Sequence, residues 1–462
     1  MQLLARSVPM ARAALQAASP DLRKLGVEQI GRAMQAALEG DAELSRHSQD
    51  LANSLIEMLQ DPDSGVASAA ASALRAAASQ SDGGDLLMGP EGRMLLQQVL
   101  QSSDAHVRMR GLHLLMSSAG QGQANLHALR TSGLLQPLRA ELSNTADVLS
   151  CSVALELVEE LSQGGPSTAR AVSQALSAEL TSLLAAPDVF LRCQAIRVSA
   201  SVCAAAAAEQ LLPNGAIMNG GPSHDHGMIT EALLRSLKPL LDPTADVEVP
   251  ASVEEAALVA VGSLGSSPAV ASLFFVDEQR LPHDVVVIAL GRAGSSDRRM
   301  AALHALARVA GVRNDREPPH MSEHAEGCFR EAVFSASGSP AAALLGFLRQ
   351  PFPEMHTAAF RFIEAFASRL WGAAECCREP QLIEQLGRLD LDLQVQPAAL
   401  HALKALAATV SDALAAPQPA EGGPGAAVAA LQGEAPRIQE LVARSRHGRP
   451  RAEYRLDVAT LP

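Results

Sequence analysis

Histidine and cysteine side chains recur at helical spacing in one short stretch of the sequence. His320, His324 and Cys328 stand at positions i, i+4 and i+8, so a helix would place all three on one face. Imidazole and thiolate groups are ligands that zinc prefers, but a structural zinc site closes with four ligands. No fourth ligand is evident here, so we expect no metal and interpret the group as a surface histidine pair beside a thiol.

Two further pairs could bind a metal or carry redox chemistry. His224 and His226 lie in a segment rich in glycine and proline, and Cys376 is followed directly by Cys377. Adjacent cysteines are more often two small half-buried side chains than a redox site. The six cysteines are scattered and form no C-x-x-C motif, which is typical of free thiols in a reducing compartment. We therefore expect no cofactor and a cytoplasmic protein that can also occur in the nucleus.

The sequence contains none of the common catalytic signatures, such as the P-loop, G-x-S-x-G or H-E-x-x-H motifs, so we expect no catalytic residues. The chain holds 37 basic and 50 acidic residues, a formal net charge of −13. This charge disfavours nucleic acid as a partner, and with it an enzyme such as a DNA glycosylase on a helical-repeat scaffold. No apolar run approaches the ~18–20 residues that span a bilayer, so we expect no membrane segment.

The composition favours helices as the elements that must position any site. The 462 residues include 85 alanines and only 3% aromatic residues, and alanine is the best helix former. A small residue followed by an apolar one recurs at spacings of 44, 41, 43, 41, 62, 45, 57 and 40 residues, most of them near the ~40–47 residues of HEAT and armadillo repeats. The pattern predicts an all-α, right-handed α-solenoid of about nine repeats. The small residues are Gly26, Ala70, Gly111, Ala154, Ala195, Ala257, Ala302, Ala359 and Ala399.

The repeats also set the expected domain boundaries. The solenoid should span residues 1–416, with loop-like inserts near 213–227 and 312–321 that account for the two long spacings. The segment 417–433 is rich in proline, glycine and alanine, which is typical of a linker. The segment 434–462 should hold a short helix and a basic tail, which is either solvated or a contact for an acidic partner or a nuclear address.

One stretch is more specific than the rest of the sequence. It reads Gln350-Pro351-Phe352-Pro353-Glu354-Met355-His356-Thr357-Ala358-Ala359 and is followed by Trp371. It resembles the C-terminal repeats of the proteasome non-ATPase regulatory subunit 5 family, which has a similar Q-P-F-P-E-x-H-x-A-A run with a tryptophan the same distance onward. Weaker likenesses in the family's order extend the resemblance over most of residues 20–410. The chain departs from the family in lacking its first repeats, in carrying a Gly/Pro insert and in its tail.

The resemblance implies a HEAT/armadillo-type, non-enzymatic assembly chaperone of the proteasome regulatory particle. Members of the family bind the C-terminal domain of an ATPase subunit of the regulatory-particle base and leave before the particle matures. For this chain the resemblance implies a monomer when free. It also suggests partner contacts at Gln350, Phe352, Glu354, His356 and Trp371.

A structural explanation of the same run stays open. Pro351 and Pro353 would begin a helix, with Glu354 in its first turn meeting the positive end of the helix dipole. The function also stays open, because fold alone does not decide a partner. A generic α-solenoid scaffold or adaptor for transport or trafficking is the alternative to the chaperone.

Overall fold

The structure is a computed structural model of the chain. It describes residues 2–119, 133–207, 224–242, 249–274, 281–291, 294–311, 321–388, 391–416 and 426–447. The chain divides into two compact units, which we describe separately. Unit 1 comprises Met1–Leu240 and Glu248–Ala260, and unit 2 comprises Leu241–Val247 and Val261–Pro462.

Helices form all the regular structure in the described residues, which confirms the predicted all-α solenoid. Those of unit 1 are α1 (Gln2–Leu15), α2 (Pro20–Leu38), α3 (Ala42–Ser45), α4 (Ser48–Glu57), the 3-10 helix η1 (Met58–Gln60), α5 (Ser64–Ala78), α6 (Ser81–Met88), α7 (Pro90–Leu100), α8 (Ala105–Ala119), α10 (Gln136–Ser143), α11 (Val148–Ser162), α12 (Pro166–Leu183), α13 (Val189–Ala207) and α14 (His224–Leu241).

Helix α15 (Ala251–Gly265) contains the boundary between the two units. The helices of unit 2 that follow are α16 (Pro268–Leu273), α17 (Leu281–Leu290), α18 (Ser296–Ala310), α19 (Glu323–Ser337), α20 (Pro340–Leu348), α21 (Pro353–Ala367), α22 (Leu370–Cys377), α23 (Pro380–Leu386), α24 (Gln396–Ala415) and α25 (Ala426–His447).

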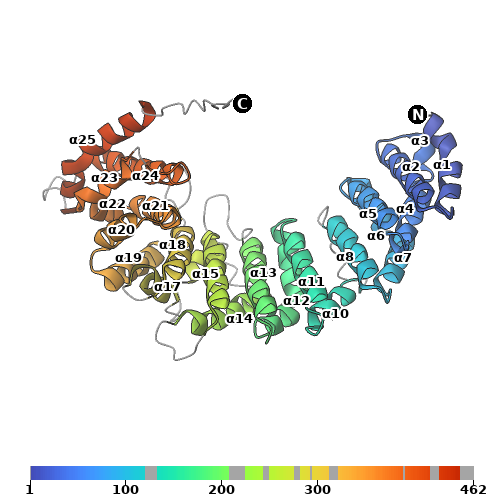
Figure 1. Cartoon of the computed structure of the whole chain (residues 1–462), viewed down its shortest axis with the longest axis horizontal. Helices are drawn as coiled ribbons and strands as arrows, with labels where there is room; N and C mark the ends of the chain where they lie inside the picture. The colour runs from blue at the N-terminus through green and yellow to red at the C-terminus, as the bar shows by residue number, and fades with distance from the viewer. Residues whose placement is uncertain are drawn as a thin grey trace, which may run out of the picture. The chain divides into compact units, whose positions relative to one another are not determined.

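The repeat register predicted from small residues is confirmed. The nine small residues fall one by one in α2, α5, α8, α11, α13, α15, α18, α21 and α24, and all nine are buried. We call these nine the second helices. In unit 1, α2, α5, α8, α11 and α13 pack in sequence on one another, and in unit 2 α18 packs on α21 and α21 on α24 (Figure 1). Each repeat therefore stacks on its neighbour, as a solenoid requires.

Local sequence explains where the second helices begin. The Asp63 carboxylate accepts the backbone N–H groups of Gly65 and Val66 at 2.9 and 3.0 Å, and caps α5. Asp147 caps α11 through the N–H of Ser150 at 3.1 Å. An N-cap carboxylate satisfies donors that the first helical turn leaves without a partner. These aspartates fix the register that the small residues then exploit.

Glycine replaces alanine where the second helix approaches its neighbour most closely. A Cβ at Gly26 of α2 would lie 2.8 Å from the carbonyl oxygen of Ala11 in α1. A Cβ at Gly111 of α8 would lie 2.9 Å from Cγ1 of Val99 in α7. Both distances are too short for real carbon contacts, so these two crossings require the absence of a side chain.

The C-terminal boundaries differ from the sequence expectation. Helix α25 begins at Ala426, so the linker predicted at 417–433 is helical in its second half, and residues 417–425 lie outside the described residues. The helix packs on α22 and α24 and buries Leu431 and Ile438 completely. The prediction failed because the segment is rich in alanine. Its composition resembles that of a linker, but alanine is also a strong helix former.

The two predicted inserts lie mostly outside the described residues. Residues 208–223 and 312–320 are not described. The first insert was expected to end at 227, but the helix α14 already begins at His224. Met321, at the end of the second expected insert, is buried.

Among the described residues, two helices are long and apolar enough to cross a membrane, judged by length and composition alone. They are α13 and α24, with mean hydropathy values of 1.3 and 1.2, and the pair α19 and α20, bent by 64°, would pass together. The expectation that no run approaches this length is therefore wrong. It failed because the apolar character of these helices is spread over alanines rather than concentrated in large residues. Within the protein, 56% of the apolar window of α13 and 33% of that of α24 are buried.

Candidate functional site

The Gln350–Glu354 run covers the turn between α20 and α21 and the first two residues of α21. Phe352 is the N-cap residue of α21, Pro353 is its first residue and Glu354 lies in its first turn. The structural explanation of the run is thus confirmed for the helix start. Two side chains also face solvent at this point, because Glu354 is exposed and Phe352 is 52% exposed. An exposed phenylalanine beside a carboxylate can contact a protein partner.

Gln350 and His356 bind each other across this turn. Nε2 of His356 donates to the backbone carbonyl of Gln350 at 2.6 Å. His356 stands three residues before the repeat's small residue, Ala359. We call this place the capping donor position, because its side chain reaches back over the loop that precedes the second helix.

Other repeats use the capping donor position in the same way. Arg23 donates to the carbonyls of Ala17 and Ala18, both at 3.0 Å. Arg108 donates to two successive loop carbonyls, also at 3.0 Å, and Gln396 donates to Leu391 at 2.9 Å. Because the same hydrogen bond recurs in other repeats, the presence of a donor at His356 is explained without any contact to a partner protein. Its imidazole already holds the loop that presents Phe352.

Trp371 is part of an aromatic cluster of unit 2. Its ring lies 6.1 Å from Phe329, 6.0 Å from Phe334 and 5.1 Å from Phe366, measured between centroids. The indole Nε1 donates to the Glu326 carboxylate at 3.2 Å. Edge-to-face contacts of this kind stabilise a core beyond simple burial. Core packing is thus the role that the geometry gives Trp371, with its edge half-buried.

Arg369 is a buried residue that the sequence analysis did not single out. It is 2% exposed, and its guanidinium donates to the carbonyls of Ala310 and Gly311 at the end of α18. The guanidinium carbon also lies 5.9 Å from the centroid of the Phe329 ring. A cation at a helix C-terminus meets carbonyls that have no partner in the helix. Only the folded chain brings α18 to this arginine, 59 residues away.

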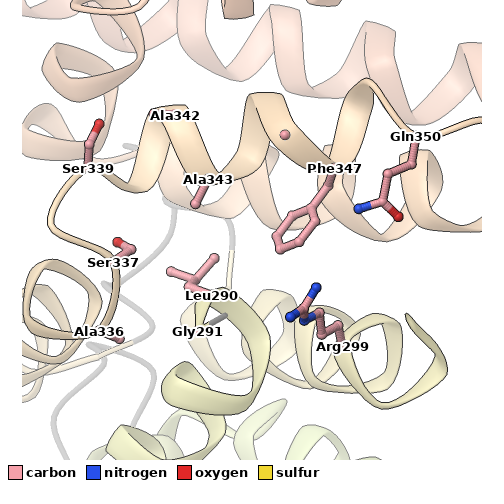
Figure 2. A pocket seen from close by; sticks show the side chains of 11 residues that line it. Leu290, Gly291, Arg299, Ala336, Ser337, Ser339, Ala342, Ala343, Phe347 and Gln350 are labelled. Carbon is pink, nitrogen blue, oxygen red and sulfur yellow. The ribbon is translucent and has the colours of Figure 1, made fainter. Parts of the chain in front are cut away.

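A cavity of about 450 Å³ adjoins Gln350 (Figure 2). The small residues Ala342, Ala343 and Gly346 of α20 leave the space, and Phe347 points into it. At one end Arg299 of α18 faces Gln350, as Figure 2 shows. The remaining lining residues are Leu290, Gly291, Ala336, Ser337 and Ser339. The lining thus combines an apolar floor with hydroxyl, amide and guanidinium groups.

The candidate metal group is only partly described. His320 lies outside the described residues, and on α19 Nε2 of His324 is 3.7 Å from Sγ of Cys328. No group of three histidine, cysteine or acidic residues suited to a metal ion occurs among the described residues. Cys376 and Cys377 are both buried free thiols, and burial raises the pKa of Cys377 to about 12. Such thiols are unreactive at neutral pH.

One family model matches part of the chain. Residues 6–183 match the sequence model of a family described as the proteasome non-ATPase 26S subunit. The matched stretch lies in unit 1, apart from the Gln350–Trp371 region of unit 2. A comparison with curated protein sequences finds no match.

Solved structures share the fold. Two crystal structures of Kap121p, one bound to Nup53p and one of a mutant, superpose with TM-scores of 0.52 and 0.53 at 11% identity, over 96% and 98% of this chain. This chain spans only 44% of the length of either. An engineered protein aligns over 95% of this chain and 99% of its own, at 18% identity and a TM-score of 0.46. The Kap121p likeness shows the α-solenoid fold alone, and the matched family model supports an association with the proteasome.

Proposed function

We propose that this protein is a non-enzymatic chaperone that binds the C-terminal domain of an ATPase subunit while the proteasome regulatory-particle base assembles. The match of residues 6–183 to a proteasome non-ATPase subunit family carries the proposal. The Gln350–Trp371 run, in the other unit, resembles a subunit of the same particle. Two separate parts of the chain therefore support one assignment. We propose a cytoplasmic protein that can also occur in the nucleus and is a monomer before it meets its partner.

Phe352 and Glu354 are the direct contacts in this proposal. Both side chains face solvent at the start of α21, so a partner can reach them without any rearrangement. Gln350 and His356 act by holding that helix start through the hydrogen bond between the imidazole and the Gln350 backbone carbonyl. Trp371 supports the surface from the ring cluster beneath it, where its indole donates to Glu326. The cavity beside Gln350 extends the contact surface toward α18 and α20.

The test mixes the purified chain with the C-terminal domain of each proteasomal ATPase subunit in size-exclusion chromatography. One of these domains should shift the chain to a one-to-one complex without nucleotide. Phe352→Ala should weaken that complex by more than about 1 kcal/mol if the ring is an anchor. Met94→Ala is the matched control, since Met94 is 58% exposed but lies on α7 in unit 1.

A chain that is folded by circular dichroism and ignores every ATPase domain would contradict the chaperone assignment. Affinity purification from cell extract would then identify the cargo of a solenoid adaptor, the second candidate. That candidate is favoured by the likeness to Kap121p, which extends over nearly the whole chain. Equal loss in the Phe352 and Met94 variants would remove Phe352 from the contact surface while leaving the function in place.

A further inference from the structure

The second helices of unit 2 expose only a narrow strip of side chains each. On α21, Arg361 is exposed while Phe360 and Phe362 on either side of it are buried. Arg361 stands two residues after the small residue of its repeat, Ala359. In each repeat with the same register, the residue two positions after the small residue should therefore point away from the core.

In unit 2 the same place is occupied by cationic or protonatable side chains. Arg361 on α21 and His401 on α24 are exposed there, and His304 on α18 is half-buried. Arg308 and Lys404 are exposed one turn further along α18 and α24. We call His304, Arg308, Arg361, His401 and Lys404 the cationic row.

Members of the row are close enough to influence one another. Helix α18 packs on α21, and α21 packs on α24. Burial lowers the pKa of His304, and the positive charges of Arg361 and Arg308 lower it further. The stem of Arg308 lies over Gly262, where a Cβ would be 3.3 Å from its Cδ. Because α18 packs on α21, Arg361 lies near enough to His304 to act on it, and the two side chains share one surface.

The row is unusual in a chain with a net charge of −13. At the same register in unit 1 the place is mixed in charge, with Glu28 on α2, Ser72 on α5, His113 on α8, Glu156 on α11 and Arg197 on α13. Exposed carboxylates of Asp297 and Glu354 stand at the starts of α18 and α21, so acid borders the row on that side. Glu364, half-buried on α21, is the acidic residue nearest the row in sequence.

The spacing of the row defines what fits it. Neighbouring helix axes lie ~8–10 Å apart, and an extended chain advances ~3.3 Å per residue. A strand laid across the three helices therefore meets a new cation at about every third residue, first Arg308, then Arg361 and then Lys404. We propose that the cationic row binds an extended acidic segment of the protein partner, running across α18, α21 and α24. The inference rests on the proposed function for the identity of the partner, whereas the chemistry of the segment follows from the row.

A protein segment fits better than a nucleic acid because of the surrounding charge. A nucleic acid carries negative charge along its whole length, and would meet the acidic remainder of the chain beyond the row. A short run of glutamate or aspartate engages the row alone. Its binding should weaken with salt, because exposed charges are screened.

The test uses a fluorescein-labelled octa-glutamate peptide and fluorescence anisotropy on the full chain at low salt. The triple variant Arg308→Gln, Arg361→Gln and Lys404→Gln should bind it about tenfold more weakly, the sum of three exposed ion pairs. The control triple variant Arg46→Gln, Arg75→Gln and Arg444→Gln removes the same charge from exposed positions elsewhere. Its dissociation constant for octa-glutamate should stay within about twofold of that of the unchanged chain, which corresponds to a difference in binding free energy of about 0.4 kcal/mol.

Two further arms separate this inference from the proposed function. An oligodeoxyadenylate that binds more tightly than octa-glutamate, and loses its binding in the row variant, would overturn the acidic-protein assignment. Equal octa-glutamate binding by both triple variants would show that the cationic row is not the binding site for acidic segments. If an ATPase domain binds the unchanged chain and the row variant equally, the cationic row does not bind the partner, and the proposed chaperone function is still supported. If no ATPase domain binds but octa-glutamate binding depends on the row, the chaperone function is contradicted and the binding of acidic segments by the row is supported.

Discussion

Units 1 and 2 link successive repeats by different interactions. In unit 1, Nε of Arg23 in α2 binds the Asp61 carboxylate at 2.7 Å, and Arg108 in α8 binds Glu141 in α10 at 2.6 Å. In unit 2, Phe329 of α19 meets Phe362 of α21 and Trp371 of α22, with centroids 6.4 and 6.1 Å apart. The same repeat register can therefore be joined by guanidinium–carboxylate pairs or by edge-to-face aromatic rings.

The difference has consequences for how each unit responds to change. Paired charges respond to pH, because a carboxylate must stay ionised to hold its arginine. A ring cluster responds instead to truncation, because removal of a ring leaves a cavity among side chains that relax only partly. Trp371 is the chain's one tryptophan, so its fluorescence reports unit 2 separately from the circular dichroism of the whole chain.

The largest expected effect comes from truncating the ring cluster. Phe366 is fully buried and lies 5.8 Å from Phe362 and 5.1 Å from Trp371, measured between centroids. Phe366→Ala should lower the free energy of unfolding of unit 2 by ~3–5 kcal/mol. Urea unfolding followed by Trp371 fluorescence measures this loss. Phe352→Ala is the control and should leave that transition in place, because Phe352 is 52% exposed.

The next effect is a difference in pH dependence between the units. In unit 1, the hydrogen bond from Arg23 holds the pKa of Asp61 below its ordinary value of 3.8. A lowered carboxylate pKa gives stability that is present above pH 3.8 and is lost as the pH falls through the folded-state pKa. In unit 2, burial and then the charges of Arg361 and Arg308 lower the pKa of His304 from 6.5. Its stability is complete above pH 6.5 and declines as the pH falls below that value.

Unfolding in urea at several pH values would separate the two ranges. The Trp371 transition should begin to weaken at a higher pH than the circular dichroism signal that remains for unit 1. His304→Gln should flatten the first decline, and Asp61→Asn should flatten the second. Asp21→Asn is the control for the second, since Asp21 is an exposed carboxylate of the same unit. A single transition with one pH profile for both signals would show that the units do not differ in this way.

The sequence predicts the repeat register well because the register is a local property. Ala302 and Ala359 are fully buried in the second helices where the spacing placed them. Close helix packing demands a small residue, and that demand is visible in the order of residues alone. The start of α21 at Pro353 follows for the same reason, since proline suits a first helical position.

Features that depend on neighbouring repeats could not be predicted from the sequence. Arg369 reads as an ordinary surface arginine until folding brings the end of α18 to its guanidinium. The cationic row is likewise invisible in the sequence, because His304, Arg361 and His401 are separated by 57 and 40 residues. Only the exposed strip of each helix shows that they share a surface. The extent of α25 was missed because alanine and glycine satisfy both linker and helix patterns.

The smallest expected effect concerns the capping donor position, which both units share. At this position unit 1 uses Arg23 and unit 2 uses His356 on α21 and Gln396 on α24. His356→Ala removes the donor to the Gln350 carbonyl and should cost ~0.5–1.5 kcal/mol of stability. His356→Gln should recover most of this loss, because glutamine already serves the same position on α24. Urea unfolding followed by Trp371 fluorescence measures both variants.

The glutamine variant also decides how His356 contributes to partner binding. If the imidazole only holds the loop that presents Phe352, His356→Gln should bind the ATPase domain as tightly as the unchanged chain. His356→Ala should bind more weakly, since a loosened loop must be ordered again on binding. If instead the imidazole touches the partner, binding would fall in the glutamine variant although its stability is restored. Stability and affinity measured on the same two variants therefore separate a residue that holds the helix start from one that meets the partner.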